Sequence, residues 1–195
     1  MALGNQNSPQ SNRKLLILKL KSKDANDQSL IPNQFQISEK VGDKWVPRDK
    51  LEARVSGNLT KMELGSGEYN KKKYGTVKLY LEDTAADEMY LLDLRYNQLS
   101  RSLFNSLLAL ESFSDVSISN YKSTGKDGKE YANISLWQGN KMVKGKFALA
   151  DIPKPDVIKN KAGEVVQRDF SEVDTFFEKH LAEFAPKVSS GGSKA

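Results

Sequence analysis

Aromatic and hydroxyl side chains alternate with apolar ones along two stretches of the chain, residues 116–122 and 131–137. Because successive side chains of a β-strand point to opposite faces, alternate residues share a face. The non-apolar face of these stretches holds Tyr121, Tyr131 and Trp137, together with serines and an asparagine. Flat rings beside hydroxyl and amide groups suit a single-stranded nucleic acid, since every base has a π-face that can stack on a ring.

A third alternating run supplies positive charge next to these aromatics. In it Lys144 and Lys146 are predicted to point outward, and Val143, Phe147 and Leu149 to point inward. Outward lysines on such a strand could bind the phosphates of the same nucleic acid. The alternative is that a second layer of structure, such as the terminal helix, covers the rings, and that the lysines only keep the protein soluble.

Other residues are further candidates for nucleic-acid binding. Tyr74, Lys78 and Tyr80 share one parity of a predicted strand, opposite Val77 and Leu79. Three consecutive lysines in a glycine-rich loop could clamp a phosphate. Arg95 and Arg101 bracket a strand-to-helix junction and could also reach a phosphate, and for both an internal salt bridge is the alternative. The three lysines are Lys71, Lys72 and Lys73.

The charge of the chain is unevenly distributed. The net charge is +5, and residues 120–168 hold ten bases against five acids. Residues 169–185 reverse the sign, with five acids against Lys179. Basic charge concentrated on particular strands and loops is typical of a surface that meets a polyanion.

The sequence offers little to an enzyme. It has no cysteine and one histidine, His180. We expect a structural role in a helix for His180. The sequence contains no phosphate-binding glycine loop and no dinucleotide fingerprint. We therefore expect no catalytic residue, no metal and no cofactor. The competing enzyme interpretation is a metal-dependent nuclease that uses the carboxylates of residues 82–93, most of which cluster in one turn.

Strands, one helix and further strands follow one another along the chain. Strands are predicted over 13–21, 35–41, 44–46, 55–64, 74–81, 89–96 and the three runs above. An amphipathic helix is predicted over 98–110, capped by Asn97. A last helix is predicted from Ser171, which would cap the amide of Asp174, to just before Pro186.

This order predicts a mainly β fold with one internal and one C-terminal helix. A partly open Greek-key barrel like the oligonucleotide-binding (OB) fold has a helix before its fourth strand, and an elaborated version fits here. An SH3-like barrel or a small sandwich with helices is the alternative. We expect one domain over residues 13–186, an N-terminal elaboration within it, and flexible ends at 1–12 and 187–195.

Several segments between residues 90 and 180 together suggest a family. They are the strand and helix start at 95–110, the strand pair 131–136 and 142–147, the segment 152–155 and the helix start at 169–172. In these segments the chain resembles the small single-stranded DNA-binding proteins of bacteriophages, which have one OB fold. The resemblance covers about half of the chain and implies DNA rather than RNA as the ligand.

The resemblance also raises the question of partners. Proteins of this class often recruit replication proteins through a flexible acidic tail, but this chain ends in a Ser-Gly-Gly-Ser stretch with a lysine. Its acidic residues lie in the predicted helix 171–184, which is therefore the candidate site for replication proteins. The oligomeric state is left open.

The sequence as a whole predicts a non-catalytic protein that coats and protects single-stranded DNA during replication or recombination, without sequence preference. The alternatives are a phage structural or protein-interaction module with a small β-barrel, and an RNA-binding barrel. No apolar run approaches the roughly 20 residues that span a bilayer, and the first residues are polar. We expect a protein without membrane spans in the cytoplasm, that of the host cell if the origin is a phage.

Overall fold

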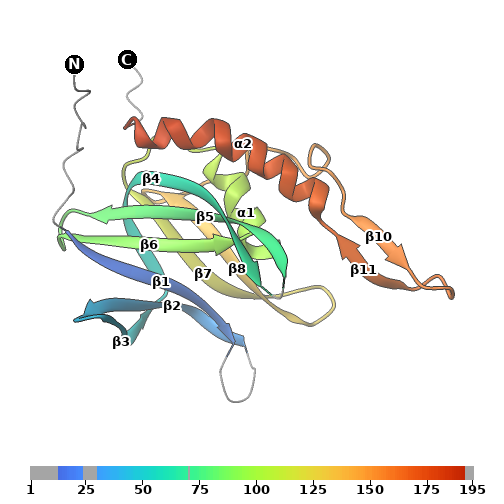
Figure 1. The fold of residues 1–195 in the computed structure, drawn as a ribbon, viewed down its shortest axis with the longest axis horizontal. Coiled ribbons are helices and arrows are strands. Elements are labelled where there is room, and N and C mark those ends of the chain that lie inside the picture. The colour runs from blue at the N-terminus through green and yellow to red at the C-terminus, as the bar shows by residue number, and fades with distance from the viewer. Residues whose placement is uncertain (1–12, 24–29, 70, 192–195) are drawn as a thin grey trace.

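The computed structural model describes residues 13–23, 30–69 and 71–191, and these form a mainly β structure with two helices (Figure 1). The strands are β1 Lys14–Lys23, β2 Leu30–Val41, β3 Lys44–Glu52, β4 Arg54–Tyr69, β5 Lys72–Asp83, β6 Glu88–Arg95, β7 Val116–Thr124, β8 Glu130–Gln138, β9 Lys141–Met142, β10 Asp156–Lys159 and β11 Val165–Asp169. The helices are α1 Gln98–Leu107 and α2 Ser171–Ser189.

A Greek key forms the centre of the fold. Strands β4, β5 and β6 are consecutive antiparallel neighbours, and α1 then returns the chain so that β7 pairs with the other edge of β4. The spatial order β7-β4-β5-β6 is that of a Greek key. The predicted mainly β fold, with an internal helix before the returning strand and a second helix at the C-terminus, is confirmed.

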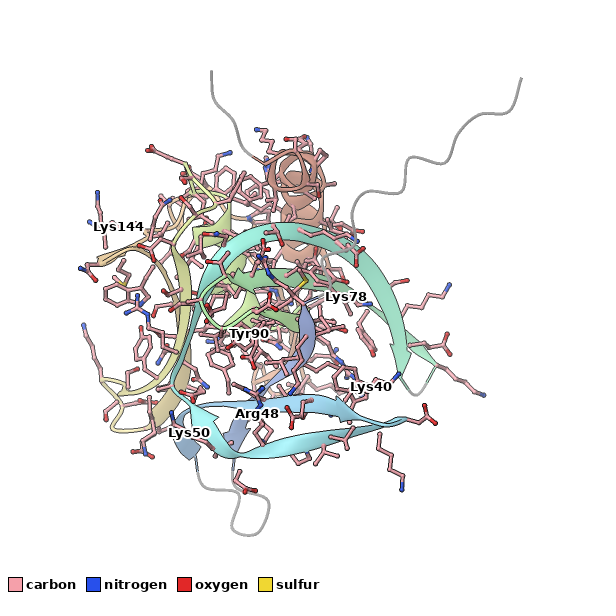
Figure 2. The ribbon with its side chains drawn as sticks, turned by 90° about the vertical axis from the view of Figure 1, so that its left-hand side faces the viewer. Lys40, Arg48, Lys50, Lys78, Tyr90 and Lys144 are labelled. Atoms are coloured by element: carbon pink, nitrogen blue, oxygen red, sulfur yellow. The ribbon has the colours of Figure 1, made fainter. Side chains whose placement is uncertain are left out.

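The sheet is open rather than closed into a barrel. Its order is β3-β2-β1-β6-β5-β4-β7-β8-β9 over the described residues, so β3 lies at one edge and β9 at the other. The first three strands extend the Greek key, because β1 pairs in parallel with β6. The sheet curls enough to bring β2 close to β7, as the end-on view shows (Figure 2).

One side of the curled sheet, together with both helices, forms the core. Val77, Leu79 and Leu81 of β5 are fully buried, as the period of two predicts. Phe104 of α1 packs edge-on against Phe177 of α2, with ring centres 6.4 Å apart. α2 lies along β4 at the top of Figure 1, and its apolar side chains complete the core.

The first helix begins where the sequence predicts. The Asn97 side chain accepts hydrogen bonds from the amides of Leu99 and Ser100, at 2.9 and 3.0 Å. The Ser100 hydroxyl accepts one from the Asn97 amide at 2.9 Å, which completes a reciprocal capping box. α1 ends at Leu107, three residues before the predicted end.

The second helix begins at Ser171 as predicted, but its cap and its C-terminal end differ from the prediction. Ser171 does not cap Asp174: its hydroxyl donates to the Asp169 carboxylate at 2.6 Å, and the Asp174 amide donates to the Phe170 carbonyl. The predicted stop before Pro186 is also wrong, since α2 continues to Ser189. Val188 is only 1% exposed, and burial of this side chain holds the last turn in place although a proline lacks an amide donor.

The third alternating run is not a strand beyond Met142. Asn105 of α1 replaces a strand partner: its side-chain amide donates to the Phe147 carbonyl and accepts from the Phe147 amide, both at 2.9 Å. Val143 and Phe147 pack against the core as predicted, but Leu149 is 89% exposed and its inward prediction is wrong. The chain is therefore held against α1 instead of continuing along β8.

Three further segments differ from the expected pattern. The expected glycine and lysine loop after β4 is a tight hairpin, because β4 and β5 stay paired to Tyr69 and Lys72. β2 starts at Leu30 and not at the predicted residue 35, while residues 24–29 lie outside the described residues. The hairpin of β10 and β11 was not predicted at all. Of the expected flexible ends, residues 1–12 and 192–195 also lie outside the description.

Candidate nucleic-acid interface

Strand pairing places the three predicted aromatics on one face. Ser117 of β7 lies opposite Trp137 of β8, and Ser123 lies opposite Tyr131. Directly paired residues point to the same side of an antiparallel sheet, and the core pair, Ile118 and Leu136, has the opposite parity. We call this outer surface the β7–β8 face; it comprises Ser117, Ser119, Tyr121, Ser123, Tyr131, Asn133, Ser135 and Trp137.

The rings of the β7–β8 face are accessible to solvent. Tyr121 is 41% exposed and Tyr131 is 42% exposed, and Trp137 is half-buried. α2 packs instead on the core side, through Phe177, Leu181 and other apolar residues. The alternative interpretation required the terminal helix to cover the aromatics. Within the described part of the chain it does not cover them.

Arg54 of β4 extends this face at Trp137. Ser119, one of the residues of the face, lies opposite Arg54, so the guanidinium is on the same side. The guanidinium carbon lies 5.3 Å from the centre of the Trp137 ring, and Nη2 donates to the Gly139 carbonyl at 3.2 Å. The indole Nε1 donates to the Ser135 hydroxyl at 3.0 Å, which fixes the ring. Arg54 was missed as a site residue, although its place before the inward Val55 indicated an outward side chain.

Tyr131 is held by the turn between β7 and β8. Its hydroxyl donates to the Asp127 carboxylate at 2.7 Å. This bond raises the pKa of Tyr131 and lowers the pKa of Asp127. The ring lies across Gly125, where a Cβ atom would come within 2.6 Å of it. The missing side chain at Gly125 therefore allows the ring to lie over the turn.

The β7–β8 face itself is uncharged, and exposed cations lie at its borders. None of its eight residues is acidic, and the Asp127 carboxylate beside Tyr131 belongs to a turn that also holds Lys126 and Lys129. Exposed cations surround it: Arg54 on β4, Lys126 and Lys129 in the turn, and Lys144 just after β9, which points away from the core in Figure 2. An anionic strand crossing this face would meet cations at three of its borders.

The second predicted surface, on β5 and β6, has a different character. Tyr74, Lys78 and Tyr80 do share the outer side of β5, as predicted, and Arg95 of β6 lies over the Tyr74 ring at 4.3 Å. The Arg95 guanidinium is thus stacked on an aromatic ring, rather than in the salt bridge considered as an alternative.

Acidic groups compete for this second surface. The Tyr80 hydroxyl donates to the Glu63 carboxylate at 2.8 Å, and burial together with Glu63 raises the pKa of Tyr80 to about 12. In the strand register Lys78 lies directly opposite Asp93 of β6 and Glu63 of β4. Lys78 lies between two acidic residues of the neighbouring strands, so this surface is less suited to phosphates than the β7–β8 face, whose own residues include no carboxylate.

The predicted lysines are not brought together. Lys71 and Lys73 are exposed at the tip of the β4–β5 hairpin, and the Lys72 side chain lies outside the described residues. This hairpin and the β7–β8 hairpin lie on opposite sides of the molecule in Figure 2. Lys146 is exposed beside the Phe147 ring, next to α1, since its amide donates to the Asn105 carbonyl.

Two other polar residues have structural positions. Arg101 forms a two-point ion pair with Asp174, at 2.7 and 3.0 Å, and so joins α1 to α2. The ring of His180 lies 4.7 Å from those of Phe147 and Phe176, which matches the expected structural role in a helix.

Comparison of the chain with protein-family models, with curated proteins and with solved structures finds no match. In the part of the chain that the structure describes, neither helix is long and apolar enough to cross a membrane. No group of three or more acidic or histidine side chains in this part could hold a metal ion.

Proposed function

We propose that this protein binds single-stranded DNA without catalysis, through the β7–β8 face and Arg54. The observation that carries the proposal is the arrangement of that face: three aromatic side chains and three hydroxyl or amide side chains that reach solvent, no acidic residue, and an arginine over the tryptophan. Aromatic rings on a basic strand surface bind bases by stacking and phosphates by charge, with little dependence on sequence.

The proposed mechanism assigns a separate task to each kind of side chain. Bases stack on Tyr121, Tyr131 and Trp137. Phosphates are neutralised by Arg54 and by the exposed lysines at the borders of the face, Lys126, Lys129 and Lys144. Ser119, Ser123 and Asn133 are at least partly exposed and offer hydrogen bonds to a base or sugar, which favours tolerance of sequence, whereas Ser117 and Ser135 are buried.

DNA as the ligand, and a role in coating the strand during replication or recombination, follow from the resemblance to bacteriophage single-stranded DNA-binding proteins. With it we propose a location in the cytoplasm of the host cell. The exposed acidic side chains of α2, including Glu172 and Glu178, are the proposed contact for replication proteins.

The test is fluorescence anisotropy of a labelled oligo-dT of about 30 nucleotides, long enough for at least one OB-fold site. A duplex and an oligo-rU of the same length serve as controls, and the titration is repeated over a range of salt concentrations. The proposal predicts tight binding to oligo-dT only. The log–log salt dependence should have a slope of about −0.7 for each phosphate neutralised.

The Arg54→Gln variant sharpens this test, with Arg95→Gln as the matched control on the other surface. Arg54→Gln should reduce the magnitude of the salt slope by about 0.7, the contribution of one phosphate on a single strand, and Arg95→Gln should leave it unchanged. Absence of binding at low salt would overturn the proposal and favour a protein-interaction module. Binding followed by degradation of the DNA when magnesium is added would favour a nuclease.

A further inference from the structure

A groove opens between the β7–β8 face and the start of α1. Its volume is about 680 Å³, and Ser123, Tyr131 and Asn133 of the face line it. Gln98 and Ser102 line it from α1. In the described structure β9 pairs only with the last two residues of β8, so no strand fills the space beside the rest of β8. We call this space the α1 groove, and through it the β7–β8 face continues onto the helix.

The α1 groove runs into a second hollow. This cleft has a volume of about 450 Å³, and Gln98 and Ser102, which are both exposed, line it as well as the groove. Ser106 is a further lining residue of the cleft. Residues four apart are neighbours on a helix surface, so these three side chains form one polar stripe along α1. Because α1 contacts both β8 and α2, the stripe leads from the face to the base of α2 (Figure 1).

The lining of the two hollows contains no carboxylate. The α1 groove has no charged lining residue, and the cleft is lined by two cations, Arg101 and Lys154. Asp174 balances the charge of Arg101, whereas Lys154 is exposed and makes no ion pair with any described residue. The acidic residues of the surrounding loop and hairpin do not line the cleft; they are Asp151, Asp156 and Asp169. The cleft therefore offers an anionic ligand one unpaired cation.

The segment after β9 brings two more cations to the cleft. Gly145 lines the cleft, and its neighbours Lys144 and Lys146 are exposed. A Cβ atom at Gly145 would come within 2.3 Å of the Asn105 side chain, so the bare backbone allows this segment to lie against α1. The Lys146 amide donates to the Asn105 carbonyl at 3.0 Å. Lys146 thus lies at the border of the cleft, although it is not on the β7–β8 face.

We infer that a single strand of DNA bound to the β7–β8 face continues through the α1 groove into the cleft. The inference rests on the proposed DNA binding and extends the path of the strand. In the groove, Gln98 and Ser102 offer hydrogen bonds to bases and sugars. At the cleft, the half-buried Phe170 and its apolar neighbours offer a surface for bases, and the exposed lysines neutralise phosphates.

Protection of single thiols tests this path, because the chain has no cysteine of its own. Ser119→Cys reports on the face, Ser102→Cys on the junction of groove and cleft, and Leu149→Cys on the cleft, where Leu149 is 89% exposed. The alkylation rate of each variant is measured with and without saturating oligo-dT of about 30 nucleotides, longer than one OB-fold site. The inference predicts that the DNA slows alkylation severalfold at all three positions. Lys161→Cys, in the turn of the β10–β11 hairpin, is the control and should react at an unchanged rate.

The salt dependence of binding gives a second measurement. Lys154→Gln should reduce the magnitude of the log–log slope for the same oligo-dT by about 0.7, the contribution of one phosphate. Lys161→Gln is the matched control and should leave the slope unchanged.

The outcomes separate this inference from the proposed function. Protection of Ser119→Cys alone, or an unchanged slope in Lys154→Gln, would overturn the path through the cleft and leave DNA binding by the face in place. Protection at none of the three positions would overturn both.

Discussion

At the scale of single residues, the proposed interface depends on rings that are held in place but not covered. Trp137 is oriented by Ser135 and Arg54, and Tyr131 by Asp127 and the bare backbone of Gly125. Ordering these side chains before the ligand arrives reduces the entropy lost on binding. The tyrosines of β5 are ordered by contacts of the same kinds, with Arg95 and Glu63, but Lys78 between them lies opposite Glu63 and Asp93.

Removing one exposed ring from the face should weaken DNA binding. Tyr121→Ala should lower the affinity for oligo-dT by about 1–3 kcal/mol, or about five- to 150-fold, because one stacked base is lost. The matched control is Trp45→Ala on β3, since Trp45 is equally exposed at 41% but lies outside the face. Anisotropy titration of both variants tests this, and equal losses in the two would contradict the choice of face.

At the scale of elements, the sequence predicts the strands and helices that are specified by local pattern. Alternation of apolar and polar residues in the sequence locates β5 and β7, and the asparagine cap locates the start of α1. One face holds Tyr121, Tyr131 and Trp137, as their alternation with apolar residues predicts, because the period of a strand is set locally.

Features that depend on distant contacts were not predictable in this way. Residues 143–149 alternate like a strand, yet Asn105, more than thirty residues earlier, holds them against α1. Similarly, α2 continues through Pro186 because Val188 is buried in a core that the local sequence does not reveal. The pairing of Arg54 with Trp137 depends on the long-range β4–β7 ladder, so spacing alone gave no reason to join them.

The capping box of α1 should contribute measurably to stability. Asn97→Ala removes the acceptor for two backbone amides at the start of the helix and should lower the free energy of unfolding by about 1 kcal/mol. Gln98→Ala, one residue further on and exposed, is the matched control and should have a much smaller effect. Urea denaturation monitored by circular dichroism provides the measurement; similar losses in both variants would argue against the cap.

At the scale of the whole molecule, an ion-pair network joins the first three strands to the Greek key. Arg48 of β3 donates to Glu39 of β2 and to Glu88 of β6, and Lys14 of β1 also pairs with Glu39. Burial alone would raise the pKa of Glu88, but hydrogen bonds from Arg48 and Tyr90 outweigh it, so the pKa lies below the ordinary value of 4.5.

This network predicts an acid-sensitive part of the stability. A carboxyl group with a lowered pKa in the folded state stabilises the fold above its unfolded pKa, and that contribution is lost as the pH falls through the folded value. The free energy of unfolding should therefore decrease as the pH is lowered from about 5, near the unfolded pKa of glutamate. Arg48→Met should flatten this decrease in a series of urea denaturations, and an unchanged slope would contradict the role of Arg48.

The central claim is that single-stranded DNA contacts the β7–β8 face, and intrinsic fluorescence tests it most directly. The chain has two tryptophans, so Trp45→Phe leaves Trp137 as the single reporter. Titration of this variant with oligo-dT should quench the Trp137 emission, because a stacked base contacts the indole. The quenching should saturate together with the anisotropy of the labelled oligonucleotide. Full binding by anisotropy with unchanged Trp137 emission would contradict the account.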